Sequence, residues 1–315
     1  MLRMFSVSAL SAVTIGDVPL EHKVYKLFYD DQLMSFQRGV IFSPCGQLII
    51  APCANLEAGT RGNGALYAEI FWHDRKAMLS VDSHPVTENG AYRIVASGVQ
   101  KEVRIWRFEY EQSAKISSKY QLAVTFLANL AGHNVAINQV KSSQNPELNL
   151  LASGDSDGRI AIWQLCNTPI SSPPIDDLPP NKENWIRIRV LNHDNEVANL
   201  AWSPDGKLLA SASSNESLLI HDISNGKRCV TVRNLRHFPS GVAWDPKGKH
   251  IVTMSTDRKM DLIGAARGRR LRMFSVSALS AVTIGDVPLQ HKVYKLFHDD
   301  QLMSFQRGVV FSPCG

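Results

Sequence analysis

Residues 185–222 read WIRIRVLNHDNEVANLAWSPDGKLLASASSNESLLIHD and predict a run of short strands. Apolar and polar residues alternate through 185–190, as a strand with one buried face requires. Three more strands are predicted, at 197–202, 208–213 and 217–220. The turn Ser203-Pro204-Asp205-Gly206 separates two of them, because proline presets φ and glycine tolerates a positive φ. Four strands linked by tight turns predict one antiparallel sheet, which needs similar neighbours to bury its faces.

Such neighbours recur along the chain. A WD40 repeat has about 40 to 45 residues, with a Gly-His-like pair before its second strand and a Trp-Asp-like pair ending its fourth. The matching features are Gly132-His133 with Ile162-Trp163, Asn192-His193 with His221-Asp222, and Arg236-His237 with Ala243–Gly248 and Thr253–Asp257. A further unit precedes them, from Trp72 to Trp106. The repeats predict an all-β fold, a WD40 β-propeller with four recognisable blades.

Composition is that of a globular chain. The 315 residues are 44% hydrophobic and 20% charged, which is ample material for a core. The formal net charge of +5 comes without a dense basic run, and this favours scattered surface charge over a nucleic-acid face. The five cysteines form no Cys-x-x-Cys pair and favour a reducing, intracellular compartment. No apolar run reaches about 18 residues, so we expect no membrane partner.

A long internal duplication frames the predicted blades. Leu2–Gly46 recurs as Leu271–Gly315, and only three positions differ, 21, 29 and 41 against 290, 298 and 310. Because one copy follows a predicted blade, we expect both copies to be propeller material and not a cleaved signal peptide. The predicted divisions are a partial blade at 1–64, blades one to four at 65–260, a basic insertion at 261–270, and a closing strand with a truncated fifth blade at 271–315.

The second predicted blade contains a serine, a histidine and an aspartate, the residue types of a hydrolase. The positions of His133 and Asp157 recur in the next blades, however, and a nucleophile needs only one site. A hydrolase would require one such set to depart from the repeat. We therefore predict no catalytic, cofactor-binding or metal-binding residue, and a structural hydrogen-bond network made of His133, Ser153, Asp157, Trp163, His193, His237 and Asp257. His221 and Gln100 stand where tryptophan and aspartate are expected, so some blades hold this network incompletely.

Two segments are candidates for surface roles. The insertion 166–184 contains five prolines with Asp176 and Asp177, and it is either a partner-docking arm or a solvated connector. The segment 261–270 adds three arginines to a basic neighbourhood. It either contacts phosphates or is a surface loop left by the duplication.

Several short motifs, taken in order, carry a resemblance. They are Glu69–His73, Val103–Trp106, Phe126–Leu130, Asn181–Trp185, Gly241–Pro246 and Phe297–Asp300 with Ser304-Phe305. This series resembles the WD40 family of the middle, or B, subunit of chromatin assembly factor 1. The related HIR-type histone regulators share the Glu-Asn-Trp and Trp-Asp-Pro features, and the Phe-His-Asp-Asp element favours the former family.

The resemblance implies a non-enzymatic scaffold in the nucleus that helps deposit histones H3 and H4 during DNA replication and repair. The implied partners are the large subunit of chromatin assembly factor 1, a histone-binding WD40 subunit, and H3 and H4 through the complex, with DNA contacted only indirectly. Against the seven-bladed ring of that family, the chain carries four blades and partial duplicated blades at both ends. Two alternatives are a HIR-type chaperone acting independently of replication and a truncated copy without function.

Overall fold

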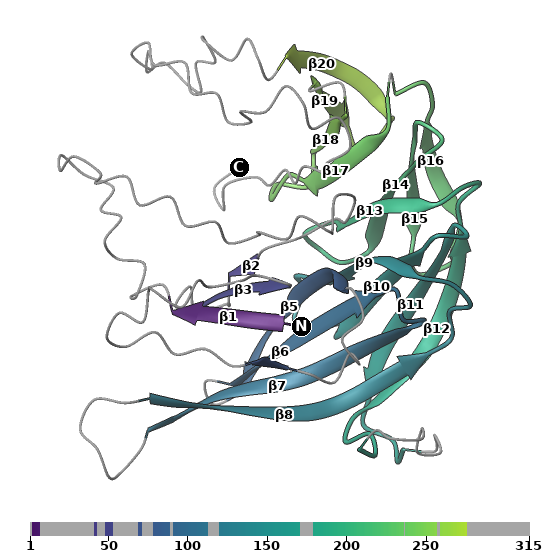
Figure 1. Ribbon diagram of the computed structural model, residues 1–315. Coiled ribbons are helices and arrows are strands. Elements are labelled where there is room, and N and C mark those ends of the chain that lie inside the picture. Colours follow the sequence, from purple (N-terminus) through teal and green to yellow (C-terminus); the bar gives the residue numbers. More distant parts are fainter. Residues whose placement is uncertain are drawn as a thin grey trace, which may run out of the picture.

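The structure is a computed structural model that describes ten stretches of the chain. They are residues 2–6, 41–42, 48–52, 69–70, 78–88, 91–112, 120–170, 179–235, 237–256 and 259–275. These stretches form twenty β-strands in five four-stranded sheets that fan out around a common centre (Figure 1). Across the same ranges the chain has no helix suited to crossing a membrane.

Four consecutive sheets make the predicted blades, and all of their pairings are antiparallel. Blade 1 contains β5 (Met78–Glu88), β6 (Ala91–Gly98), β7 (Glu102–Gln112) and β8 (Tyr120–Ala131). Blade 2 contains β9 (Ile137–Ser142), β10 (Leu150–Asp155), β11 (Arg159–Cys166) and β12 (Asn184–Asn192). Blade 3 contains β13 (Val197–Trp202), β14 (Leu208–Ser213), β15 (Ser217–Asp222) and β16 (Arg228–Val232). Blade 4 contains β17 (Pro239–Trp244), β18 (His250–Ser255), β19 (Lys259–Gly264) and β20 (Arg269–Ser275).

The sheet predicted within residues 185–222 is wrong in one strand. β12 pairs with β11 along its whole length, from Asn192 opposite Arg159 to Asn184 opposite Cys166, and so closes blade 2. The fourth strand of blade 3 is β16, which pairs with β15. Each sequence repeat therefore supplies the outer strand of one blade and the three inner strands of the next. This offset makes the chain itself a link between neighbouring blades.

A fifth sheet contains the two described parts of the first copy of the duplicated segment, residues 2–6 and 41–42. Its strands lie in the order β2 (Ile41–Phe42), β3 (Leu48–Pro52), β1 (Leu2–Ser6) and β4 (Glu69–Ile70). The sequence Leu-Arg-Met-Phe-Ser is thus an inner strand here, whereas its second copy lies in the outer strand β20. The part of the predicted segment 271–315 that follows Ser275, with its truncated fifth blade, falls outside the described residues.

The segment 261–270 is not an insertion between strands. Its first four residues belong to β19, which pairs with β18 from Met260 opposite Met254 to Gly264 opposite His250. Its last two residues open β20, where Arg270 pairs with Ile263. Gly268 has a φ of +62° and donates its N–H to Gly264, which closes a tight turn between them. The arginines therefore belong to an ordinary hairpin of blade 4, which is completed by β20 as the sequence predicted.

One irregularity repeats in every blade. The pairing of the two outer strands contains a β-bulge, which leaves one extra residue in the outermost strand. The bulged residues are Leu127 in β8, Ile188 in β12, Cys229 in β16 and Leu271 in β20. The bulges place the four blades in a common register, so that positions in different blades can be compared directly.

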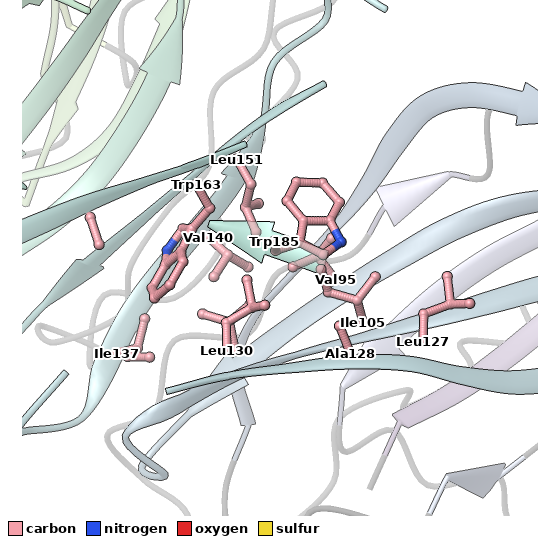
Figure 2. Packing of buried hydrophobic residues seen from close by; sticks show 12 residues of the cluster. Val95, Ile105, Leu127, Ala128, Leu130, Ile137, Val140, Leu151, Trp163 and Trp185 are labelled. Atoms are coloured by element: carbon pink, nitrogen blue, oxygen red, sulfur yellow. The ribbon is translucent and has the colours of Figure 1, made fainter. Parts of the chain in front are cut away.

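The core lies in the seams between blades. Between blades 1 and 2, one cluster joins Val95 and Ile105 to Leu151, Trp163 and Trp185, and Figure 2 shows their side chains pointing toward one another. Similar clusters join blade 2 to blade 3 and blade 3 to blade 4. A sheet with a neighbouring blade on each side buries both of its faces. The two faces of one strand therefore contribute side chains to two different seams.

Hydrogen bonds between inner strands fix the order of the blades. The Asp82 carboxylate accepts from the Ser142 amide at 2.7 Å, and the Trp202 indole donates to the Lys141 carbonyl at 2.8 Å. Asn199 donates in the same way across the next seam, to Ser240 at 3.0 Å. Each blade is thus tied to the next by polar contacts as well as by apolar packing.

Gly158 should tolerate substitution least among the turn glycines of the blades. Its φ is +85°, and a Cβ there would lie 2.6 Å from the His193 carbonyl and 2.7 Å from that of Asn195, both fixed backbone atoms. Gly248 has a similar φ of +71° but faces open space, with Pro204 at 3.9 Å. We expect Gly248→Ala to lower the free energy of unfolding by about 1 kcal/mol and Gly158→Ala by more than about 2 kcal/mol, measured by urea denaturation. Equal losses would contradict the close approach of blade 3 to Gly158.

Candidate functional site

A chain of hydrogen bonds links four buried side chains of blade 2. The Trp163 indole N–H donates to Ser153 Oγ at 2.8 Å, and Ser153 Oγ lies 2.7 Å from His133 Nε2. His133 Nδ1 lies 2.7 Å from Asp155 Oδ2. The network assigns one tautomer to the histidine, in which Nδ1–H donates to the carboxylate and Nε2 accepts the serine proton.

The strand register brings these four residues together. Ser153 and Asp155 lie on the same face of β10, two residues apart, and Trp163 lies on the neighbouring strand β11. His133 comes from the loop that leads into blade 2. The other carboxylate oxygen of Asp155 accepts the backbone amides of Asp157 at 3.0 Å and Arg159 at 2.8 Å. The network therefore fastens the entering loop and the β10–β11 turn to the middle of the sheet.

The residue types match those of an acyl-transfer triad, but the geometry does not serve that chemistry. Ser153 and Asp155 are 0% exposed, and His133 is 6% exposed. Ser153 Oγ already accepts one hydrogen bond and donates another, so it is enclosed on both sides. A substrate carbonyl has no path to this oxygen. The structural role predicted for His133, Ser153 and Trp163 agrees with these contacts.

Asp157 does not belong to the network. Its side chain is exposed, and it contributes only its backbone N–H to the carboxylate of Asp155. Asp157 is the aspartate directly before the turn glycine, Gly158, and this position led to its prediction. The distance from the tryptophan identifies the network aspartate instead. Asp155 precedes Trp163 by eight residues, as Ser213 precedes His221 in blade 3.

Blade 3 holds the same positions without the hydrogen bonds. His193, Ser211, Ser213 and His221 replace the histidine, serine, aspartate and tryptophan, and all four are at least 94% buried. Ser211 Oγ, Ser213 Oγ and His221 Nδ1 make no hydrogen bond within the described ranges, and the Ser211 carbonyl lies near the His193 ring. Three buried polar groups thus remain uncompensated in this blade.

Burial sets the protonation of the two histidines of blade 3. It lowers the pKa of His193 to about 4, against opposing effects of the nearby Ser211 carbonyl and Asp194 carboxylate. It also lowers the pKa of His221 to about 4, and the charges of Arg228 and His193 add to this effect. Both rings are therefore neutral at neutral pH.

Blade 4 has apolar residues at only two of the four network positions, since Thr253 and Ser255 stand buried at the serine and aspartate positions. His237, predicted as a network residue, is exposed. The buried histidine position is occupied by Leu235, whose amide donates to the Glu216 carbonyl as that of His193 donates to Gly158. Leu235 stands four residues before β17, the same interval that separates His193 from β13. This interval, rather than the nearest histidine, would have identified the position in the sequence. Asp257 lies outside the described residues.

Blade 1 lacks the network at the same positions. In the common register, Ala96 and Gly98 stand at the serine and aspartate positions, and Trp106 stands at the tryptophan position. Ser97 faces the opposite seam, where its Oγ lies 3.4 Å from the Ile137 carbonyl of blade 2. Of the described residues, no three histidine, cysteine or acidic side chains are grouped so as to hold a metal ion.

Removing the central serine should distinguish blade 2 from blade 3. Ser153→Ala leaves the Trp163 N–H and His133 Nε2 unpaired, so we expect the free energy of unfolding to fall by about 1 to 3 kcal/mol. Ser211→Ala is the matched control, because its buried Oγ makes no hydrogen bond. We expect this control to change the stability by less than about 1 kcal/mol in urea denaturation. A larger loss for Ser211→Ala than for Ser153→Ala would refute the assignment of the network.

Stability should fall as the pH is lowered below the ordinary histidine pKa. The unfolded chain binds protons at His193 and His221 with a pKa near 6.5, whereas the folded chain does so only near 4. The stability is therefore complete above pH 6.5 and declines below it, by on the order of 2 kcal/mol per histidine at pH 5. His221→Trp or His193→Leu, which copy blades 2 and 4, should reduce this decline in denaturation series at pH 7 and pH 5. A wild-type stability independent of pH over this range would contradict the burial of both rings.

Comparisons with known proteins agree with this architecture. Residues 64–315 match the family described as the CAF1B/HIR1 beta-propeller domain. The B subunit of chromatin assembly factor 1 from Mus musculus is 32% identical over 253 residues, and that from Gallus gallus is 31% identical over 252 residues. Each alignment covers 78% of this chain and 42% of the relative. Protein HIR1 of Candida albicans is 26% identical over 269 residues, which cover 78% of this chain and 28% of that protein.

Solved structures support the fold. Sqt1 from Chaetomium thermophilum superposes with a TM-score of 0.52 at 17% identity, over 80% of this chain and 65% of that one. A chain of the mitotic checkpoint complex gives 0.51 at 18% identity, over 84% of this chain and 74% of that one. The chain spans less than half the length of the mouse and chicken relatives, and the family match leaves out most of the fifth sheet. With the match over 64–315 and the four blades in register, the chain belongs to the CAF1B/HIR1 β-propeller family.

Proposed function

We propose that this chain is the propeller subunit of a nuclear chromatin assembly complex that deposits histones H3 and H4 during DNA replication and repair. The observation that carries the proposal is the family match over all four blades, with the mouse and chicken relatives above 30% identity. The HIR1 relative is less similar, at 26% identity. Replication-coupled assembly is therefore favoured over the HIR-type alternative.

The geometry supports a scaffold rather than an enzyme. The serine and histidine that could act as a nucleophile and a base are locked in the interior of blade 2. The blades form a rigid set of packed sheets with loops and strand edges on the outside, which other proteins can bind (Figure 1). In this role the chain would hold the large subunit of chromatin assembly factor 1 and a histone-binding WD40 subunit.

Charge argues for histone contact through the assembled complex. The chain has a formal net charge of +5, and H3 and H4 are basic, so direct contact over a broad surface would be repulsive. Asp176 and Asp177 in the 166–184 insertion give one local acidic segment. We propose that this insertion assists histone binding, while DNA is reached only through the histones.

The test is reconstitution of the complex. We expect the full chain, co-expressed with the large and the histone-binding WD40 subunits, to co-purify with them and to retain H3–H4 on size-exclusion chromatography. A variant with Asp176→Asn and Asp177→Asn should assemble normally but retain less H3–H4. A matched control, Glu147→Gln on the exposed loop between β9 and β10, should behave as the wild type.

The outcomes separate the alternatives. Failure to join the large subunit, with a folded chain, would overturn the proposal and leave a copy without this function. Assembly with HIR-type partners in its place would favour the replication-independent role. If the Asp176 and Asp177 variant retained histones fully, only the role of the insertion would be excluded.

A further inference from the structure

Within the described residues, one short segment is hydrogen-bonded to the outer edge of a blade. Residues 181–183 lie against the edge of β8, where the amides of Lys182 and Glu183 both donate to the Leu127 carbonyl, at 2.7 and 3.1 Å. The Asn181 side-chain amide accepts from the Asn129 N–H at 2.8 Å and donates to its carbonyl at 3.3 Å. This edge of blade 1 therefore makes hydrogen bonds to main-chain amides at the bulge and to a side-chain amide two residues after it.

Among the described residues, no segment covers the equivalent edge of blade 2 in this way. In the common register, Ile188 is the bulged residue that corresponds to Leu127, and Val190 corresponds to Asn129. The same register turns the Ile188 carbonyl and the Val190 N–H outward. β12 is the edge strand of its sheet, and among the described residues no hydrogen bond from outside the sheet reaches the backbone of either residue.

This edge is unusually apolar for an exposed strand. Ile186, Ile188 and Val190 are 43%, 36% and 48% exposed, and they are three of the five large exposed hydrophobic residues in the part of the chain that the structure describes. β12 lies at the rim of the propeller (Figure 1). Of the features that usually protect such an edge, β12 has two arginines and a bulge, but it has no proline and no covering segment among the described residues. A long, exposed and apolar edge is the kind of surface to which an extended peptide adds.

The charges beside the edge are positive and have no carboxylate partner among the described residues. Arg187 donates to the Gly132 carbonyl at 3.1 Å, and Arg189 donates to the carbonyls of Ile223 and Ser224. Arg228 on β16 lies 3.4 Å from the Asn192 carbonyl. Neutral carbonyls position these guanidinium groups without neutralising them, and neither β12 nor β16 contains an acidic residue. An acidic ligand would find complementary charge here.

We propose that the outer edge of β12 is a docking site for an extended, acidic segment of a partner protein, which adds to blade 2 as a fifth strand. Its main chain bonds to the Ile188 carbonyl and the Val190 N–H, the groups whose counterparts in β8 bond to residues 181–183. Its aliphatic side chains pack on Val190, on the face toward blade 1, and its carboxylates face Arg189 and Arg228, on the face toward blade 3. This site is independent of the proposed function, because it rests only on the geometry of blades 1, 2 and 3.

The test uses the full chain and a fluorescein-labelled peptide of nine residues, the length of β12, in which valine alternates with glutamate. We expect the peptide to bind in fluorescence anisotropy, and Val190→Glu to weaken binding at least about tenfold through repulsion and lost apolar contact. Ile188→Glu should act in the same way and replaces it if Val190→Glu fails to fold by circular dichroism. The matched control is Thr231→Glu, at the same exposed position of β16, two residues after the bulge. It should change the affinity less than about twofold.

Two further measurements identify the mode of binding. Hydrogen exchange of the Val190 amide should slow in the presence of the peptide, and a lysine–valine peptide should not bind. The proposal is overturned if the glutamate–valine peptide does not bind, or if the lysine–valine peptide binds equally well. It is also overturned if Thr231→Glu weakens binding as much as Val190→Glu, or if exchange at Val190 is unchanged.

Discussion

The structure depends on the burial of both faces of each sheet against its two neighbours. A single four-stranded sheet has no third layer to cover it, so the apolar residues of a blade become a core only where another blade meets them. Trp163 and Trp185 of blade 2 complete a cluster with Val95 and Ile105 of blade 1, while Ile160 and Ile162 serve the opposite seam. Stability is therefore a property of the seams, and the short polar links between inner strands fix which sheets meet.

The polar networks show how far this packing can replace hydrogen bonds. Blade 2 keeps all four members of its network, and each buried polar atom of its serine and histidine is satisfied. Blade 4 has leucine and isoleucine at two of the positions and buries them as core. Blade 3 has polar residues at all four positions, but the Ser211 and Ser213 hydroxyls are buried and unpaired, as is the Thr253 hydroxyl of blade 4. The fully paired version of blade 2 avoids the cost of uncompensated burial that the other two blades carry.

Much of the fold could be read from the sequence because strand alternation and turn chemistry are local. The turn at 203–206 lies where its residues predict, and the strands at 197–202 and 208–213 have the predicted bounds. The predictions that failed depended on contacts between distant parts of the chain. Nothing within residues 185–190 shows that β12 pairs with the preceding strand β11, since an outer strand has the same alternation whichever sheet it joins. The choice of Asp157 and His237 failed for a related reason, because an aspartate and a histidine each stood two positions after the buried site. The free edge of β12 was equally hidden, as exposure depends on what lies beside a strand.

Because of the offset between repeat and blade, the segment that a duplication copies is not the segment that folds as one sheet. A copied repeat brings the outer strand of one blade and the inner strands of the next, so it joins two blades and does not form a complete one. The duplicated stretch begins at the same point of the repeat, since each of its copies opens with the sequence of an outer strand. In blade 4 that strand finds β19 and takes the outer place, whereas in the fifth sheet it pairs with β3 and β4 and lies inside. The position of such a strand is therefore set by the neighbour it meets, and one pentapeptide can be interior or rim within a single chain.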